Sequence, residues 1–243
     1  MGDTAFDQRQ FDVLYPPGVE LHYWSLCRNR IIARYLRRHA APGPILEVGC
    51  GKGVVVSYLR DKGFPVVGVE LAPVTPLPGM EPFVRTGFDV NALGSGEAST
   101  YRTVLLLDVI EHLPDPRGFL MMLKTRLPGL QLVLVTVPAR QELFSNFDRF
   151  NGHFRRYDGA MVSDHLAPCA AGGMSWSYAF HLLYPAARLQ LRLRGAREVG
   201  FRVPGGALGR WVHRMIAALL YFDHLLIPST WKGTSIIACA RIE

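Results

Sequence analysis

A glycine-rich segment with a flanking acid is the part of the chain whose residue types and spacing best suit ligand binding. The segment ILEVGCGKG (45–53) places Glu47 in an apolar run and then alternates glycines at Gly49, Gly51 and Gly53. Glycines permit positive φ and let a ligand approach the backbone, and a helix that begins here directs free N–H groups at that ligand. A dinucleotide fingerprint, G-x-G-x-x-G, would need glycine at position 54, where this chain has valine. The segment therefore predicts a ligand-binding turn with G-x-G-x-G spacing.

The elements that must position this turn alternate in type along the chain. Short apolar runs predict strands at 45–49, 65–71, 83–87, 103–109 and 131–137. Amphipathic or capped segments predict helices at 20–40, 52–63 and 115–127. This alternation predicts an α/β fold with a doubly wound parallel sheet. Such sheets bind ligands beyond the carboxyl ends of their strands, so one rim should hold Gly49–Gly53, Glu70, residues 108–112 and the loop after Val137.

The rest of the chain predicts a C-terminal subregion and no second domain. It contains a helix at 158–170, a strand at 174–182, helices at 185–194 and 205–227, and a closing strand at 235–242. With 243 residues, 49% hydrophobic and 19% charged, the chain is neither disordered nor built from repeats. We predict one domain over 1–243, divided into an N-terminal helical lid (1–42), a cofactor-binding core (43–140), a substrate-side loop and helices (141–231) and a closing strand (232–243).

Several motifs in order carry a resemblance to a known family. The glycine-rich turn, with an acid two residues before its first glycine, resembles motif I of the class I S-adenosylmethionine-dependent methyltransferases, and LLLDVIEHLPDP (105–116) resembles their fourth-strand segment. LHYWSLCRNRII (21–32), DRFNGHFRRYD (148–158) and KGTSIIACARI (232–242) look like segments of a less characterised bacterial branch. The resemblance spans nearly the whole chain. It implies a Rossmann-like, doubly wound seven-stranded sheet with an antiparallel last strand and extra C-terminal helices.

The resemblance also implies S-adenosylmethionine as the cofactor and names its contacts. The glycine-rich turn would line the methionine and ribose, Glu70 would accept hydrogen bonds from the ribose hydroxyls, and Leu71 would flank the adenine. Asp89 resembles the acid that binds the adenine amino group, although GFDV departs from the family's more usual Gly-acid order, and a surface turn is the alternative. The implied cofactor set is Glu47, Gly49, Cys50, Gly51, Gly53, Glu70, Leu71, Asp89, Asp108 and Val109.

Two histidines on the expected rim are the candidate catalytic residues. Methyl transfer from a sulfonium is an in-line displacement, so the enzyme must mainly align the reactants, and a hydroxyl acceptor gains from a general base. His112 follows the fourth predicted strand and His153 lies in the loop after the fifth. Histidine titrates near neutral pH and suits this role. The alternatives are that His112 bonds to backbone at a helix start and that His153 locks its loop.

Two segments supply candidate substrate-binding residues. Arg155, Arg156 and Tyr157 suit an anionic acceptor because arginine offers a bidentate fork, or these arginines pair with the nearby Asp148 or Asp158. His22, Trp24 and Arg28 form a lid over the pocket, or they belong to a plain amphipathic helix that packs on the sheet. The residues leave both pairs of alternatives open.

Charge and cysteine usage limit the partners. Most of the net charge of +7 lies after residue 150, as single arginines among apolar residues between 185 and 227. This pattern fits a peripheral membrane face for a lipid-linked acceptor, or a homodimer interface or substrate cap; no nucleic-acid motif accompanies it. The four widely spaced cysteines predict no metal site and a reducing compartment. With a polar N-terminus and no span of about 20 apolar residues, we expect a cytoplasmic protein, with peripheral contact at the inner membrane face left open.

These observations favour an S-adenosylmethionine-dependent methyltransferase. Oxygen of a small or lipid-linked metabolite is the preferred acceptor atom, because a rim histidine is present and the Asn/Asp-Pro-Pro-Tyr tetrapeptide of N-methyltransferases is not. A catalytically inactive S-adenosylmethionine-binding partner protein is the alternative. The valine at position 54 counts against a nicotinamide oxidoreductase.

Overall fold

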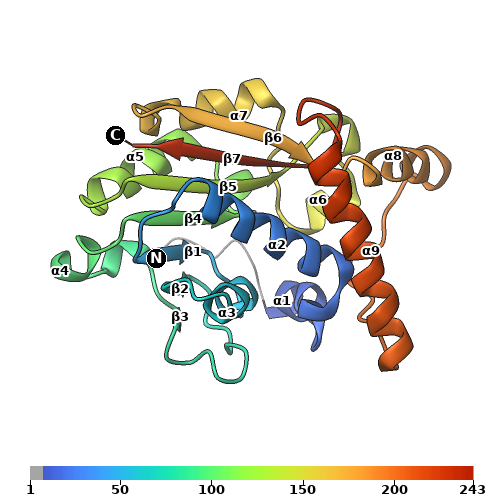
Figure 1. Ribbon diagram of the computed structural model, residues 1–243, viewed down its shortest axis with the longest axis horizontal. Helices are drawn as coiled ribbons and strands as arrows, with labels where there is room; N and C mark the ends of the chain where they lie inside the picture. Colours follow the sequence, from blue (N-terminus) through green and yellow to red (C-terminus); the bar gives the residue numbers. More distant parts are fainter. Residues whose placement is uncertain (1–7, 243) are drawn as a thin grey trace.

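The computed structural model describes residues 8–242, so the first residues of the predicted lid and polar N-terminus (1–7), and residue 243, lie outside the described part. A single seven-stranded sheet runs through the molecule in the order β3-β2-β1-β4-β5-β7-β6 (Figure 1). Its strands are β1 (Ile45–Val48), β2 (Val66–Glu70), β3 (Val84–Thr86), β4 (Thr103–Leu107), β5 (Leu132–Pro138), β6 (Met174–Ala179) and β7 (Ser235–Arg241).

The central strands are parallel, and the helices that connect them cover both faces of the sheet. Every residue of β1 and β4 is buried, which explains why their sequences are continuous apolar runs rather than alternating patterns. Neighbouring pairs β3–β2, β2–β1, β1–β4 and β4–β5 are all parallel. β7 pairs antiparallel with β5 on one side and with β6 on the other. The Rossmann-like sheet with an antiparallel last strand, predicted from the sequence, is confirmed.

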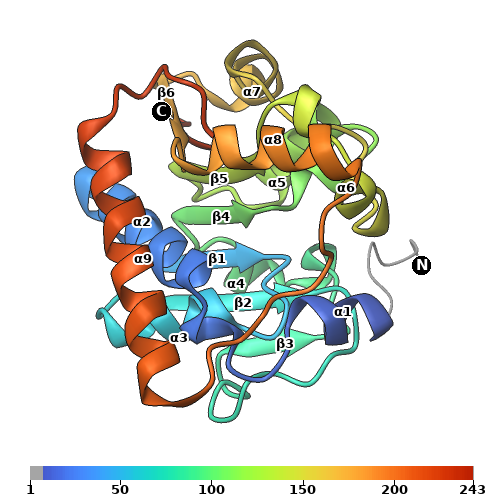
Figure 2. The same cartoon turned by 90° about the vertical axis from the view of Figure 1, so that its right-hand side faces the viewer.

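Helices cover the two faces of this sheet. One apolar cluster joins α2 (Tyr23–Arg38), α3 (Val54–Asp61) and α9 (Gly206–Leu226), which lie on the same face in Figure 2. The other cluster joins α4 (Ser95–Ala98), α5 (Pro116–Arg126) and α7 (Gly159–Leu166). The remaining helices are α1 (Gln8–Leu14), α6 (Asn146–Phe150) and α8 (Leu183–Arg194), with short 3-10 turns such as Ile110–His112 between elements. Each predicted strand and helix is present within a few residues of its expected bounds.

The first turn of α2 and the helices after β6 are arranged around the carboxyl ends of the strands. The His22 side chain caps α2 by accepting a hydrogen bond from the Trp24 N–H, and the apolar face of α2 packs on the sheet and against α9. Figure 2 looks onto the carboxyl ends of the parallel strands, which the chain between α8 and α9 crosses. Within residues 8–242, no helix combines the length and apolar character needed to cross a bilayer.

Candidate active site

A cavity of about 690 Å³ lies at the carboxyl ends of β1, β2, β4 and β5. Its base is formed by the ends of these strands, as expected for a doubly wound sheet. Its walls come from α1, the first half of α2, the chain between α8 and α9, and the loop that follows β5. Of the predicted site residues, the cavity is lined by His22, Trp24, Arg28, Glu47, Gly49, Cys50, Glu70, Asp108, His112, His153 and Arg156.

The glycine-rich turn passes from β1 into α3 at the edge of this cavity. Gly49 has φ of 75°, and a Cβ there would lie 2.8 Å from Cγ2 of Val109. Gly53 caps α3 in the left-handed region, with φ of 85°. The turn therefore needs glycine for its backbone conformation and, at Gly49, also for the close approach of the segment that follows β4.

Replacing Gly49 tests this close approach against a matched control. Gly63 also has a positive φ, of 82°, but nothing lies within 4 Å of the Cβ it lacks. We expect Gly63→Ala to cost about 1–2 kcal/mol of stability from backbone strain alone. Gly49→Ala should cost more, because it must also displace Val109, and should weaken ligand binding in the cavity at least tenfold. Thermal melts and calorimetric titration would measure both; equal effects of the two variants would contradict the expectation.

Two carboxylates lie beside the turn in different surroundings. Glu70 accepts hydrogen bonds from the Gly51 and Ala72 N–H groups, both at 2.9 Å, which hold its side chain at the end of β2. Burial raises the pKa of Glu70 against the lowering effect of these bonds. Glu47 is only 3% exposed, and its Oε2 has no hydrogen-bond partner among the described residues. Burial raises the pKa of Glu47 to about 8 despite the charge of Arg28. Glu47 thus offers the cavity an unsatisfied acceptor that would attract a cationic donor.

Arg28 connects α2 to the end of β4. Its guanidinium donates to Asp108 Oδ2 at 2.6 Å and to Thr136 Oγ1 at 3.2 Å, and Thr136 Oγ1 donates in turn to Asp108 Oδ1 at 3.2 Å. The Arg28 group also lies over the ring of Trp24, 4.9 Å from its centroid. Asp108 has a φ of 58° in this arrangement. The predicted lid residue Arg28 is therefore ion-paired across the cavity floor, and the rest of α2 packs as an amphipathic helix.

His112 and His153 line the cavity beyond the ends of β4 and β5, where their rings face each other. Their ring centroids are 4.7 Å apart, in an edge-to-face arrangement. Burial, followed by the neighbouring His153, lowers the pKa of His112 to about 3. The His112 ring is therefore neutral at neutral pH.

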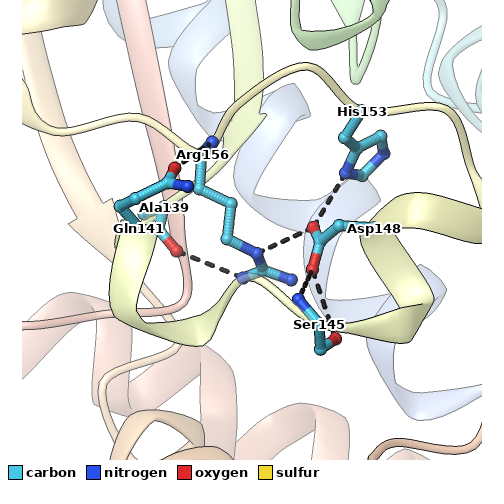
Figure 3. A network of polar contacts seen from close by, with 6 residues as sticks. All are labelled: Ala139, Gln141, Ser145, Asp148, His153 and Arg156. Carbon is cyan, nitrogen blue, oxygen red and sulfur yellow. Dashed lines mark hydrogen bonds and ion pairs between the residues drawn. The ribbon is translucent and has the colours of Figure 1, made fainter.

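A buried acid holds His153 in place (Figure 3). His153 Nδ1 lies 2.9 Å from Asp148 Oδ1, which also accepts from Arg156 Nε at 2.8 Å. The second oxygen of Asp148 accepts from the Ser145 N–H at 2.9 Å. Burial acts to raise the pKa of Asp148, but the His153 bond and the Arg156 charge outweigh it and hold that pKa below its usual range. The carboxylate thus stays ionised and fixes the orientation of the His153 ring.

Arg156 is committed to this network. Besides Asp148, its guanidinium donates to the Ala139 carbonyl at 3.1 Å, and the side chain is 3% exposed. Of the two alternatives that the sequence left open for this arginine, the structure shows the ion pair with Asp148. Its contribution to the cavity is to position His153 through the shared carboxylate.

The other predicted site residues lie outside the cavity lining. Tyr157 is fully buried in the core and donates to the Ile110 carbonyl, Arg155 donates to the Pro114 carbonyl, and Asp89 accepts from the Asn91 N–H as the cap of a 3-10 turn. Four more residues lie next to lining residues without being among them: Gly51, Gly53, Leu71 and Val109.

The N-terminal segment that contains α1, and the chain between α8 and α9, also bring to the cavity residues that were not predicted from the sequence. Phe11, Leu14 and Tyr15 line the cavity, and the Tyr15 hydroxyl would lie 2.7 Å from a Cβ at Gly51 in the glycine-rich turn. Arg197 and Phe201 enter from the other side. The spacing of Phe11, Leu14 and Tyr15 is a helical apolar signal that was available in the sequence. Nothing local marks Arg197 or Phe201 as cavity residues.

The family comparison agrees with this geometry. A family model described as "Methyltransferase domain" matches residues 22–181, which include β1 to β6 and the facing pair His112 and His153. The chain belongs to this methyltransferase family. The methyltransferase assignment predicted from the glycine-rich turn, Glu70 and the segment after β4 is thereby confirmed.

Curated relatives of this methyltransferase share part of its length. It is 30% identical over 116 residues to "Ubiquinone biosynthesis O-methyltransferase" of Hahella chejuensis, covering 44% of this chain and 49% of that protein. It is 29% identical over 137 residues to the protein of the same name in Xanthomonas euvesicatoria, covering 53% and 56%. The chain thus spans about half the length of the curated relatives it matches.

Solved structures resemble this methyltransferase in fold. The methyltransferase domain titled bacterial-CtHen1-CN is 15% identical with a TM-score of 0.51, covering 88% of this chain and 97% of that one. Burkholderia thailandensis 1,6-didemethyltoxoflavin-N1-methyltransferase, solved with S-adenosylhomocysteine bound, is 16% identical with a TM-score of 0.50, covering 90% and 80%. At these identities the likeness concerns the architecture of the sheet and its helices.

Proposed function

We propose that this protein transfers a methyl group from S-adenosylmethionine to a hydroxyl of a small or lipid-linked acceptor. The observation that carries the proposal is that one cavity joins two carboxylates beside a glycine-rich turn to a histidine pair backed by a buried aspartate. When bound, S-adenosylmethionine supplies an electrophilic methyl group on a sulfonium, and the electron pair of the broken bond stays on sulfur. The chain itself must bind the cofactor and the acceptor, orient them for transfer, and accept the proton of the acceptor hydroxyl.

The carboxylate end of the cavity fits the cofactor. The unsatisfied Oε2 of Glu47 suits the ammonium of the methionine moiety, and Glu70, held by two backbone N–H groups, suits the ribose hydroxyls. The positive-φ turn leaves the backbone at Gly49 and Cys50 open to the ligand. We place the adenine towards Leu71 and Val109, which follow the lining residues Glu70 and Asp108 in the chain, and towards Asp89.

The histidine end fits a hydroxyl acceptor. His153 is oriented by an ionised carboxylate, the arrangement that prepares an imidazole to accept a proton through its other ring nitrogen. His112 faces it and narrows the space into which an acceptor must fit. The name O-methyltransferase, which the curated relatives carry, supports oxygen over nitrogen as the acceptor atom.

Methyl transfer itself is the test. Purified protein is incubated with methyl-labelled S-adenosylmethionine and a panel of phenolic, anionic and lipid-linked hydroxyl compounds, with Glu70→Ala beside it. We expect label in one class of acceptor and at least a tenfold weaker cofactor affinity in the variant. Tight S-adenosylmethionine binding without transfer to any acceptor would favour the inactive binding protein. Failure of the folded wild type to bind S-adenosylmethionine would remove the proposal altogether.

The outer face of α9 supports a lipid-linked acceptor. Apolar side chains recur at helical spacing and are all more than half exposed: Leu208, Trp211, Met215, Leu219, Phe222 and Leu226. Exposed Arg210 and Arg214 lie on the same helix, which runs along the outside of the molecule in Figure 1. We propose that this face rests on an anionic membrane, because arginines beside an apolar stripe match lipid headgroups, whereas self-association would bring like charges together.

Vesicle binding checks this surface. The double variant Leu219→Glu/Phe222→Glu places two charges in the stripe without touching its buried side, and should lower co-sedimentation with phosphatidylglycerol vesicles at least tenfold. Met121→Glu, a similarly exposed site on α5, is the control and should bind as the wild type does. A wild type that does not bind anionic vesicles would contradict the membrane proposal. A dimer in solution that the double variant dissociates would show instead that another copy of the chain covers this face.

A further inference from the structure

The histidine pair and the neighbouring Glu111 form a group of three potential metal ligands. One donor atom of each of Glu111, His112 and His153 lies within 4.8 Å of the others. We propose that these residues bind a divalent transition-metal ion, which holds the acceptor hydroxyl. This inference rests on the proposed O-methyl transfer for its purpose, but on geometry alone for the site. The four cysteines, which are scattered through the fold, take no part in it.

Glu111 is the observation that points to a cation. Its side chain is 0% exposed, and neither carboxylate oxygen has a hydrogen-bond partner among the described residues. Its own backbone carbonyl is occupied by the Phe154 N–H at 2.9 Å, so the loop that carries His153 is bonded directly to this residue. A buried carboxyl with two unsatisfied oxygens is costly, because it has lost water without gaining a partner. A metal ion in the gap would satisfy it.

His153 is arranged as metal-binding histidines usually are. Its Nδ1 is engaged by the Asp148 carboxylate at 2.9 Å, which fixes the ring and leaves Nε2 as the nitrogen available to a ligand. A carboxylate that holds the far nitrogen of a ligating histidine is the common outer partner in such sites. Asp148 is in turn anchored by Arg156 and Ser145, so the ring direction is set before any ion arrives (Figure 3).

The spacing requires the ligands to move closer together. Ligand atoms about 2.0–2.2 Å from a tetrahedral ion lie about 3.3–3.6 Å from one another, so two donors as far apart as 4.8 Å must approach by about 1.2–1.5 Å. Two imidazoles and one carboxylate suit Zn²⁺, Mn²⁺, Fe²⁺ or Co²⁺ rather than Ca²⁺, which prefers oxygen ligands. Three protein ligands leave coordination positions open for other groups.

The open positions face the acceptor. His112 and His153 line the cavity, whereas Glu111 lies behind them, so an ion held by all three would present its free side to the cavity. A hydroxyl oxygen bound there would release its proton to solvent water more readily, because the ion stabilises the oxyanion that then accepts the methyl group. The His153 ring would then act as a ligand rather than as the proton acceptor. As metal ligands, His112 and His153 would help to hold and activate a hydroxyl. This role does not depend on the basicity of His112.

Cobalt binding tests the site without reference to activity. Metal-free wild type is titrated with Co²⁺, and visible absorption reports ligation by histidine. We expect one Co²⁺ per chain, with bands that disappear, or affinity that falls at least tenfold, in Glu111→Gln and His153→Ala. Glu111→Gln keeps the side-chain volume and removes only the anionic ligand, so its fold should survive, and S-adenosylhomocysteine titration checks this. His39→Ala, at the far end of α2, is the control and should bind Co²⁺ as the wild type does.

Two results of the cobalt titration would overturn the proposal. One is a wild type that binds S-adenosylhomocysteine but shows no cobalt bands. The other is a cobalt spectrum that persists in both Glu111→Gln and His153→Ala. These outcomes are separate from the fate of the proposed function: methyl transfer that continues in a chelator, with Glu111→Gln as active as the wild type, would leave the His153–Asp148 pair as the base and remove the metal alone. Cobalt binding without methyl transfer would keep the site and remove the O-methyltransferase.

Discussion

Glu47→Gln is expected to weaken S-adenosylmethionine binding about 100-fold at pH 7.5 while making the ligand-free protein more stable. The carboxyl is buried with its Oε2 unsatisfied, so its charge is useful only when a cation arrives. A neutral amide of the same shape removes the buried acid and also the counter-charge for the ligand's ammonium. The opposite signs of the two effects distinguish a ligand-binding acid from a structural one.

The pH dependence of the two effects follows from the raised pKa. Burial raises the pKa of Glu47 from 4.5 to about 8, so the folded state favours the protonated acid, and its stability falls as the pH rises from about 4.5 through 8. Near pH 7.5, three pH units above the unfolded-state pKa, Glu47→Gln should therefore be more stable than the wild type by about 4 kcal/mol, with the difference vanishing below pH 4.5. Chemical denaturation at several pH values measures it.

Cofactor affinity should rise with pH in the wild type only. Binding requires the Glu47 carboxylate, so each pH unit between 6 and about 7.5 should improve the wild-type affinity by up to tenfold, and binding should release one proton. The rise should stop near pH 8, where the ligand's own α-amino group begins to lose its proton. Calorimetry in buffers of different ionisation enthalpy counts that proton. Glu142→Gln, an acid at the protein surface outside the cavity lining, is the control. An affinity that is flat with pH, or a variant with unchanged affinity, would show that Glu47 does not meet the ammonium.

The sheet could be predicted from the sequence because its strands are buried on both faces. β4 and β5 are continuous apolar runs, and turn residues such as Pro42 and Pro138 mark where elements end. The glycine-rich turn was also visible, since its backbone conformation requires particular residues at fixed spacing. These features are local in the chain, so a single sequence contains them.

The partners of the charged residues could not be predicted in the same way. Arg28 and Asp108 are 80 residues apart, and their ion pair depends on where α2 crosses the end of β4. Two acids, Asp148 and Asp158, are near Arg156 in the sequence, and the fold of the loop places Asp148 beside it. The approach of Glu111 to His153 has the same origin, because two loops from different strands meet there. Such pairings depend on tertiary placement, which residue type and spacing leave undetermined.

His153→Ala and Asp148→Asn should have similar effects on turnover and different effects on stability. Both remove the oriented imidazole at the acceptor end, and we expect each to lower kcat by a factor on the order of 10³ with little change in cofactor affinity. Loss of the His153 ring leaves Asp148 paired with Arg156 and Ser145, so stability should fall by only about 1 kcal/mol. Asp148→Asn instead leaves the buried Arg156 without its counter-charge, which should cost about 3–5 kcal/mol.

The difference in stability between His153→Ala and Asp148→Asn, at similar turnover, identifies the role of the Asp148–His153–Arg156 network. If Asp148 only braced the loop, His153→Ala would remain active, because Arg156 and Ser145 would still hold the acid in place. If His153 acts on the acceptor, His153→Ala is folded, binds S-adenosylhomocysteine normally and fails at transfer. Thermal melts, calorimetry and single-turnover rates on the same samples measure the three quantities. A nearly active His153→Ala would assign the histidine to loop structure and move the search for the activating group to His112.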